Sequence, residues 1–187
     1  MRIISGKYKS RRLWAPKNLP VRPTTDMSKE GVFNVINNWY YFDDIKVLDL
    51  FSGTGNISYE FASRGTTNIL AVDQHHGCIK YINQTAKELE LDITTVKADV
   101  YKFLERHKGK HDVIFADPPY DFTEAQFSKI SELVFDNELL TQRGTLIIEH
   151  SQETDLSRAP HFTEAKRYGG CMFSIFEVVK DEEESND

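Results

Sequence analysis

Residues 45–55 read IKVLDLFSGTG and combine two local signals that decide the fold. The first half is an apolar run of strand length, and the second half ends in Gly53-Thr54-Gly55. Two glycines directly after a strand allow a tight turn in which the backbone can approach a neighbouring group closely. The stretch therefore predicts a buried strand at Ile45–Phe51, followed by a turn into a helix over residues 55–64.

The same alternation of a short apolar strand with a helix continues along the chain. We expect further strands at Ile69–Val72, Ile93–Val96, Asp112–Ala116, Thr145–Glu149, 161–168 and 173–179, and further helices at Met27–Trp39, 76–90, Val100–His107 and 123–135. This order is typical of an α/β fold whose parallel sheet is covered on both faces. Because ligands bind beyond the carboxyl ends of such strands, the residues just after each strand are the candidate site residues.

The glycine loop at residues 53–55 either binds a ligand or only turns the chain. A dinucleotide-binding loop would have a third glycine where Ser58 stands, and a phosphate-binding loop would have Gly-Lys-Ser or Gly-Lys-Thr, which is absent. A plain strand-to-helix turn is the simpler alternative. If the loop binds a ligand, it favours a nucleoside over a pyrophosphate.

Two acidic residues follow the second and third predicted strands. Asp73 is placed to accept hydrogen bonds from both hydroxyls of a ribose. Asp99 is placed to accept one from an exocyclic amine such as that of adenine. Each could instead cap the helix that follows it, and for Asp99 the two roles are compatible. The position of Asp73 relative to the glycine loop favours the ligand-binding role.

The strongest local signal follows the fourth predicted strand and reads Asp117-Pro118-Pro119-Tyr120. Two prolines remove two backbone donors and stiffen the turn. The carboxylate of Asp117 and the carbonyl of Pro118 would then offer two acceptors to one NH2 group and orient its lone pair outward. Tyr120 offers a flat face on which a base can stack. The alternative is a proline-rich loop with one exposed aromatic residue.

The composition predicts one folded domain in the cytoplasm. Of 187 residues, 40% are hydrophobic and 12% aromatic, which excludes disorder and collagen-like structure for most of the chain. We find no apolar run of membrane-spanning length and no secretory signal. The two cysteines, Cys78 and Cys171, imply neither a disulfide framework nor a cysteine-based metal site.

The net charge of −6 conceals an asymmetry between the two ends of the chain. Residues 1–22 contain no acid and seven basic residues: Arg2, Lys7, Lys9, Arg11, Arg12, Lys17 and Arg22. A local basic segment can bind phosphates whatever the overall charge, although a solvated surface is the plain alternative. Residues 181–187 read DEEESND, and we expect a disordered acidic tail there.

Taken together, these residues resemble the S-adenosylmethionine-dependent methyltransferases of the Rossmann-like class that act on amino groups. The order of motifs resembles the bacterial 16S rRNA guanine-N2 methyltransferase family in particular. The matching segments are 1–11 (MRIISGKYKSR), 22–26 (RPTTD), Phe33-Asn34, 48–53 (LDLFSG), Arg64-Gly65, the DPPY stretch at 117–120 and Arg167-Tyr168-Gly169. One departure is Gly31, where the family usually has alanine, and we expect it to weaken its helix slightly.

The resemblance implies a seven-stranded, mostly parallel sheet with an antiparallel last strand, preceded by a small extension of short strands and a helix. It divides the chain into a basic RNA-contacting extension (1–40), a methyltransferase core (41–180) and the acidic tail (181–187). It also implies three sets of site residues. They are catalytic residues Asp117, Pro118 and Tyr120; cofactor-binding residues Asp49, Ser52, Gly53, Gly55, Asp73 and Asp99; and RNA-binding residues Arg2, Lys7, Lys9, Arg11, Arg12 and Arg22.

The expected reaction is methylation of a guanine N2 amine by a cytoplasmic monomer that uses no metal and acts on 16S rRNA or a small-subunit assembly particle. Alternatives are a DNA or RNA adenine-N6 methyltransferase, a protein glutamine or small-molecule methyltransferase, an NAD-dependent dehydrogenase and a non-catalytic RNA-binding module. The short chain leaves little room for a DNA-recognition domain. Glutamine methyltransferases usually have asparagine where Asp117 stands, and Ser58 disfavours a dinucleotide site. A pure RNA binder would need neither Asp117 nor the glycine loop.

Overall fold

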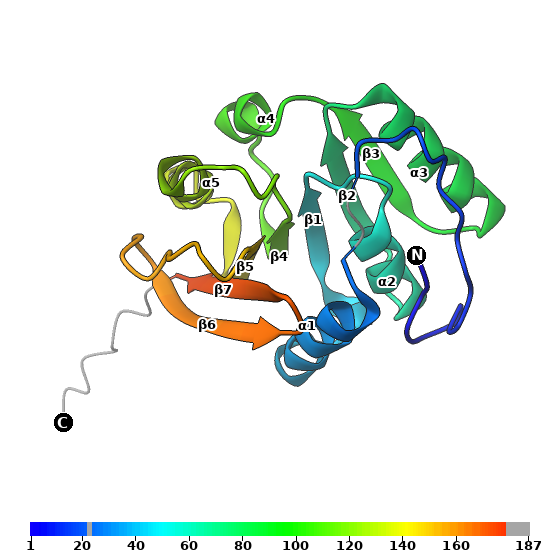
Figure 1. The fold of residues 1–187 in the computed structure, drawn as a ribbon, viewed down its shortest axis with the longest axis horizontal. Coiled ribbons are helices and arrows are strands. Elements are labelled where there is room, and N and C mark those ends of the chain that lie inside the picture. The colour runs from blue at the N-terminus through cyan, green and yellow to red at the C-terminus, as the bar shows by residue number, and fades with distance from the viewer. Residues whose placement is uncertain (22–23, 179–187) are drawn as a thin grey trace.

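A computed structural model describes residues 1–21 and 24–178 and has the expected α/β architecture (Figure 1). One seven-stranded sheet has the strand order β3-β2-β1-β4-β5-β7-β6. The strands are β1 (Lys46–Leu50), β2 (Asn68–Asp73), β3 (Ile93–Lys97), β4 (His111–Ala116), β5 (Leu140–His150), β6 (Phe162–Tyr168) and β7 (Cys171–Glu177). Arg22 and the predicted acidic tail at 181–187 lie outside the described residues.

The direction of the strands agrees with the expected pattern. Strands β1 to β5 pair in parallel with one another. Strand β7 is antiparallel to both β5 and β6, so the last strand of the chain is inserted between them. The parallel strands direct their carboxyl ends to one edge of the sheet, where a ligand site is expected.

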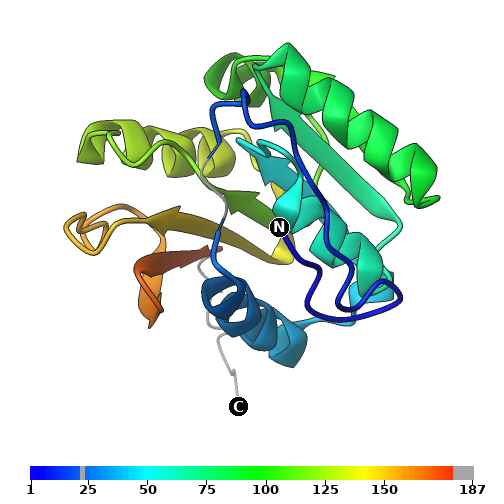
Figure 2. The same ribbon diagram turned by 45° about the vertical axis from the view of Figure 1, so that its right-hand side comes forward.

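Within residues 1–21 and 24–178, five α-helices cover the sheet, and they divide between its two faces (Figures 1 and 2). They are α1 (Asp26–Trp39), α2 (Asn56–Ser63), α3 (His76–Glu88), α4 (Val100–Arg106) and α5 (Glu124–Asp136). Helices α4 and α5 share one core with Leu48 and Leu50 of β1, whereas α1 and α2 share another with Val47. Because successive residues of β1 alternate between two buried faces, the strand is apolar almost throughout.

Most element boundaries lie within three residues of those predicted, and β5 is the exception. It begins at Leu140, five residues before the predicted Thr145. Its pairing with β4 shifts register between His111, which lies opposite Leu140, and Val113, which lies opposite Thr145. This irregularity interrupts the apolar pattern, which explains why the sequence indicates only the regular second half.

The N-terminal extension contains the predicted helix, but its extended pieces pair only through an isolated bridge between Arg2 and Arg12 within residues 1–21. The reason lies in its hydrogen bonds. The backbone N–H groups of Ile4 and Ser5 donate to the Glu60 carboxylate at 2.9 and 3.0 Å, so they cannot form a strand ladder. The part of the extension before α1 lies over α2 and α3, as the dark blue segment shows in both views (Figures 1 and 2).

Glu60 of α2 also forms ion pairs with two basic side chains. Its side chain is fully buried, with Lys29 Nζ at 3.2 Å from one carboxylate oxygen and Arg64 Nε at 2.9 Å from the other. Lys29 also donates to the backbone carbonyl of Arg2 and to Asn56 Oδ1. One buried carboxylate thus joins the extension, α1 and α2 into one body.

Replacing Gly31 with alanine tests how closely α1 approaches the sheet. Helix propensity alone predicts stabilisation by about 1 kcal/mol. However, a Cβ atom at Gly31 would lie 2.4 Å from two ring atoms of Tyr168, which is too close for any contact. We therefore expect Gly31→Ala to lower the free energy of unfolding by roughly 1–3 kcal/mol, because the clash outweighs the propensity gain. Urea denaturation measures this, and a more stable variant would contradict it.

Candidate active site

A cavity of about 640 Å³ lies at the carboxyl ends of the parallel strands. It is lined by residues that follow β1, β2, β3 and β4, together with parts of the N-terminal extension. The predicted site residues in its wall are Asp49, Ser52, Gly53, Asp73, Asp99, Asp117, Pro118 and Tyr120. The fold therefore brings together, in one cavity, residues that are up to 71 positions apart in the sequence (49 to 120).

The glycine loop is held against the end of β2 by hydrogen bonds. Gly53 has φ +52° and donates its backbone N–H to Asp73 Oδ2 at 2.8 Å. The other oxygen, Asp73 Oδ1, accepts from the backbone N–H of His75 at 2.8 Å. An ionised carboxylate has about four acceptor positions, so Asp73 can bind ribose hydroxyls while it fixes the loop.

Position 55 requires glycine for a packing reason that the sequence did not indicate. It has φ +87°, a conformation that favours glycine, and it lies outside the cavity wall. A Cβ atom there would lie 2.8 Å from the ring of Tyr59 and 2.9 Å from Ile82. Gly55 thus allows α2 and α3 to pack closely behind the loop, and its expected contact with a ligand stays a prediction.

Asp49 and Ser52 supply polar atoms at the base of the cavity. Asp49 is 1% exposed, and its Oδ2 accepts from the hydroxyl of Ser58 at 2.6 Å. Burial raises the pKa of Asp49 to about 7 from its usual 3.8, and the bonds from Ser58 act in the opposite direction. The Ser52 hydroxyl is buried with no hydrogen-bond partner among the described residues, and Ser52 lines the cavity, so this hydroxyl is a candidate partner for a ligand.

Asp99 has one of its two predicted roles, that of a helix cap, and its predicted ligand contact stays a prediction. It caps α4, and its Oδ1 accepts from the backbone N–H of Lys102 at 3.0 Å. It also lines the cavity next to Val100 and Tyr101. The cap fixes the carboxylate at the cavity edge, which is compatible with a contact to an exocyclic amine.

The DPPY stretch forms another part of the cavity wall. The backbone N–H of Asp117 donates to the carbonyl of Leu50 at 3.3 Å, which attaches the stretch to the end of β1. Pro118 is buried, and Pro119 is exposed. The hydroxyl of Tyr120 donates to Glu149 Oε1 at 3.0 Å. Burial and the adjacent Glu149 carboxylate raise the pKa of the Tyr120 phenol well above its usual value of 10, so the phenol stays protonated.

Glu149 is a site residue that sequence reasoning missed. It lies near the end of β5, lines the cavity and is 2% exposed. Besides the Tyr120 hydroxyl, it accepts the hydroxyl of Thr24 at 3.1 Å. The available signal was one acid in the otherwise apolar run TLIIEH, at the same strand end as the other site residues.

Residues 1–177 match the sequence profile of the family described as "Conserved hypothetical protein 95". The chain belongs to this family. A similar member is "Putative rRNA methyltransferase YlbH" of Bacillus subtilis, which is 36% identical over 165 residues that cover 83% of this chain and 85% of that protein. "Ribosomal RNA small subunit methyltransferase D" of Escherichia coli is 26% identical over 161 residues, which cover 86% of this chain and 79% of that protein.

A solved structure is similar over almost the whole chain. It is titled "Putative methyltransferase yhhF from Escherichia coli", with a TM-score of 0.81, 26% identity and coverage of 94% of this chain and 96% of that one. The family and the Rossmann-like methyltransferase fold that the sequence predicted are therefore confirmed.

In this member of the Conserved hypothetical protein 95 family, the structure describes five of the predicted RNA-binding residues, all of them on the N-terminal extension. Arg2 and Arg12 lie on paired pieces of the extension near α1, and Arg2 makes an ion pair with Asp26 at 2.9 Å. Lys7, Lys9 and Arg11 lie on and after the turn near the carboxyl ends of α2 and α3, where Lys7 N–H donates to the carbonyl of Ser63. All five side chains are exposed.

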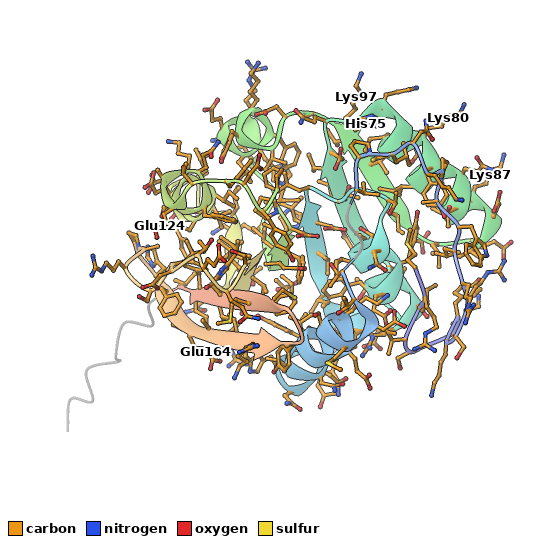
Figure 3. All side chains as sticks on the ribbon, in the orientation of Figure 1. His75, Lys80, Lys87, Lys97, Glu124 and Glu164 are labelled. Atoms are coloured by element: carbon orange, nitrogen blue, oxygen red, sulfur yellow. The ribbon has the colours of Figure 1, made fainter. Side chains whose placement is uncertain are left out.

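Further basic side chains outside the extension face solvent on the same side of the molecule. Figure 3 shows Lys80 and Lys87 pointing outward from α3, along which the extension runs, and His75 and Lys97 near the cavity end of the sheet. Among the described residues of this family member, no three His, Cys, Asp or Glu side chains gather in a way that could hold a metal ion. Within the same residues, no helix has both the length and the apolar character needed to cross a membrane.

Proposed function

We propose that this protein transfers a methyl group from S-adenosylmethionine to the exocyclic N2 amine of a guanine in 16S ribosomal RNA. The observation that carries the proposal is that Asp117 and Pro118 line the same cavity as the glycine loop and Asp73. Family membership and a relative named for small-subunit ribosomal RNA support the substrate class. The proposal places the protein in the cytoplasm, as a monomer that acts on the RNA or on a small-subunit assembly particle.

The residues around the cavity fit S-adenosylmethionine. Asp73 has acceptor positions for ribose hydroxyls beyond those used by Gly53 and His75. The buried Ser52 hydroxyl needs a partner, and Asp99 stands at the edge where an adenine amine would lie. Asp49 supports the loop through Ser58. When bound, S-adenosylmethionine supplies a reactive methyl group on a positively charged sulfur.

In this proposal Asp117 and Pro118 prepare the guanine amine. The carboxylate and the carbonyl each accept a hydrogen bond from one of the two N–H groups, so the nitrogen lone pair is directed away from them. As the nitrogen gains positive charge, the Asp117 carboxylate stabilises it more strongly than it stabilises the neutral amine. A proton then leaves the nitrogen for Asp117 or for water. Much of the acceleration would come from holding the amine in line for attack.

Tyr120 would form the wall on which the target base stacks after it leaves its own stack. The ring can do this only if its orientation is fixed. Glu149 fixes it by accepting the phenol hydroxyl, and the same carboxylate also holds Thr24 of the N-terminal extension. Glu149 is thus a positioning residue in the proposal.

Replacing Glu149 with alanine is expected to lower kcat/KM for RNA about tenfold, because one buried acceptor of two hydroxyls is lost. Glu149→Gln keeps an acceptor oxygen and should recover most of the loss. Steady-state kinetics and calorimetric titration with S-adenosylhomocysteine measure the two effects. If alanine and glutamine variants lose equally, or if cofactor affinity falls in parallel with turnover, the positioning role is wrong.

The basic side chains of the extension (Arg2, Lys7, Lys9, Arg11, Arg12 and Arg22) would bind RNA phosphates. Their exposure and the further lysines of α3 support a basic path along α3, which leads from the cavity end of the sheet to the turn that contains Lys7 and Lys9. The excess of acidic residues in the rest of the chain would limit non-specific binding to RNA.

The experiment that tests the proposal incubates the protein with methyl-labelled S-adenosylmethionine and either naked 16S rRNA or small subunits from cells that lack the enzyme. The RNA is digested and the labelled nucleoside is identified by its mass. We expect N2-methylguanosine. Label in N6-methyladenosine would instead indicate an adenine methyltransferase, label in protein a glutamine methyltransferase, and RNA binding without label a non-catalytic RNA-binding protein.

A further inference from the structure

A hollow beside the active site contains an exposed tryptophan that the proposed reaction does not use. Trp14 is 79% exposed. It lines a surface hollow of about 460 Å³ together with Met1, Arg2, Arg12, Leu13 and Asp26. A single exposed aromatic residue is common in proteins, so its neighbours decide whether it binds anything.

The pairing of the extension places Trp14 and the arginines on one face. Arg2 and Arg12 are opposite each other in the antiparallel bridge, and Ile3 and Leu13 next to them are buried. Side chains of opposed residues point to the same face, and side chains two residues apart along an extended chain also do so. Arg2, Arg12 and Trp14 therefore share the outer face, while Ile3 and Leu13 attach the inner face to the core.

The charge of this hollow is suited to an anion. It contains two arginines and one acid, and the acid, Asp26, is already paired with Arg2. Arg12 makes no ion pair within residues 1–21 and 24–178, and its side chain is exposed. An apolar ring beside guanidinium groups matches a nucleotide, whose base stacks on the ring and whose phosphate binds the cation.

The hollow also lies close to the active-site cavity. Thr24 lines the cavity and Asp26 lines the hollow. Two residues of chain span at most about 7 Å, so the two sites are neighbours at the start of α1.

We propose that Trp14 is a stacking platform for an unpaired nucleotide of the RNA substrate outside the active-site cavity, and that Arg12 binds the phosphate of that RNA segment. The inference rests on the proposed function for the identity of the RNA. The Trp14 site would hold single-stranded RNA beside the target guanine and so raise affinity for RNA. It would not contribute to the chemical step or to cofactor binding.

Tryptophan fluorescence tests the contact directly, because the chain has two tryptophans, Trp14 and Trp39. In the full-length Trp39→Phe protein, titration with a single-stranded oligoribonucleotide from 16S rRNA should quench the emission of Trp14. In the matched Trp14→Phe protein, the same titration should leave the emission of Trp39 nearly unchanged. This measurement needs no turnover, so it tests stacking even if the proposed reaction is wrong.

A second set of variants separates the contribution of stacking to RNA affinity from the contribution of charge. We expect Trp14→Ala to weaken RNA binding about tenfold and Trp14→Phe to weaken it less, with kcat and the cofactor Kd unchanged. The dependence of RNA affinity on salt should keep its slope in Trp14→Ala and become shallower in Arg12→Ala. Equal losses in the phenylalanine and alanine variants would contradict stacking.

Three results would overturn the inference. They are no quenching of Trp14 by RNA, an emission change caused by protein concentration alone, and a response to small-subunit proteins without RNA. The second would assign the hollow to another copy of this chain, and the third to a protein partner. If the protein methylates guanine while Trp14 shows no response to RNA, the stacking site is wrong and the proposed function stands.

Discussion

Asp117→Ala is expected to reduce methyl transfer by about 10²–10³-fold, because the group that stabilises developing charge on the amine is lost. The change should act on kcat. The affinity for S-adenosylmethionine should stay within a few-fold, since the loop and ribose contacts of the proposal come from Gly53 and Asp73. Single-turnover kinetics with saturating RNA, together with calorimetric titration of the cofactor, separates the two effects.

The control for this experiment is Asp121→Ala, which removes an exposed acid four positions further along the same loop. Its turnover should match that of the original protein. If Asp117→Ala lowers cofactor affinity and turnover equally, Asp117 belongs to the cofactor site and not to the amine. If it retains full turnover, the proposed chemistry is wrong.

Glu60→Ala is expected to have the largest effect on stability, a loss of about 3–5 kcal/mol in the free energy of unfolding. The substitution leaves the fully buried Lys29 ammonium without its carboxylate and removes acceptors from the backbone of Ile4 and Ser5. Burial already lowers the pKa of Lys29, and Glu60 opposes that shift. Without Glu60, the folded protein would therefore hold an uncompensated charge or a neutral lysine.

Glu30→Ala is a matched control, because Glu30 is an exposed acid next to Lys29 on α1. We expect it to change stability by less than about 0.5 kcal/mol. Urea denaturation compares both variants. Limited proteolysis should also cleave the N-terminal extension of Glu60→Ala first, since its backbone loses two hydrogen bonds to α2, those of Ile4 and Ser5. A loss below about 1 kcal/mol for Glu60→Ala would show that the extension is held mainly by its other contacts, which are the burial of Ile3 and Leu13 and the hydrogen bonds to Ser63.

The sequence predicts the sheet, and the edge of the sheet at which the site lies, because the decisive signals are local. The run ending at Leu50 and the glycines after it determine a strand and a turn without any distant partner. Parallel pairing then brings Asp73 and Asp117 to the same edge, as the alternation of elements requires. Once the order of elements is known, the position of the cavity follows.

What the sequence did not predict depends on contacts between distant segments. Glu149 reads as a polar strand end until the fold places Tyr120 and Thr24 against it. Glu60 reads as an ordinary acid on a short helix, although three donors from distant segments (Ile4, Ser5 and Lys29) and Arg64 of its own helix end surround it. Gly31 reads as a weak point in α1 until the ring of Tyr168 shows why no side chain fits.

The most direct test of the central claim is a crystal structure of the protein with S-adenosylhomocysteine and guanosine. We predict that the adenosine moiety lies in the cavity between Asp73 and Asp99. The guanine N2 amine should then lie within hydrogen-bonding distance of both the Asp117 carboxylate and the Pro118 carbonyl. A guanine that binds elsewhere, or an Asp117 side chain turned away from the amine, would contradict the account.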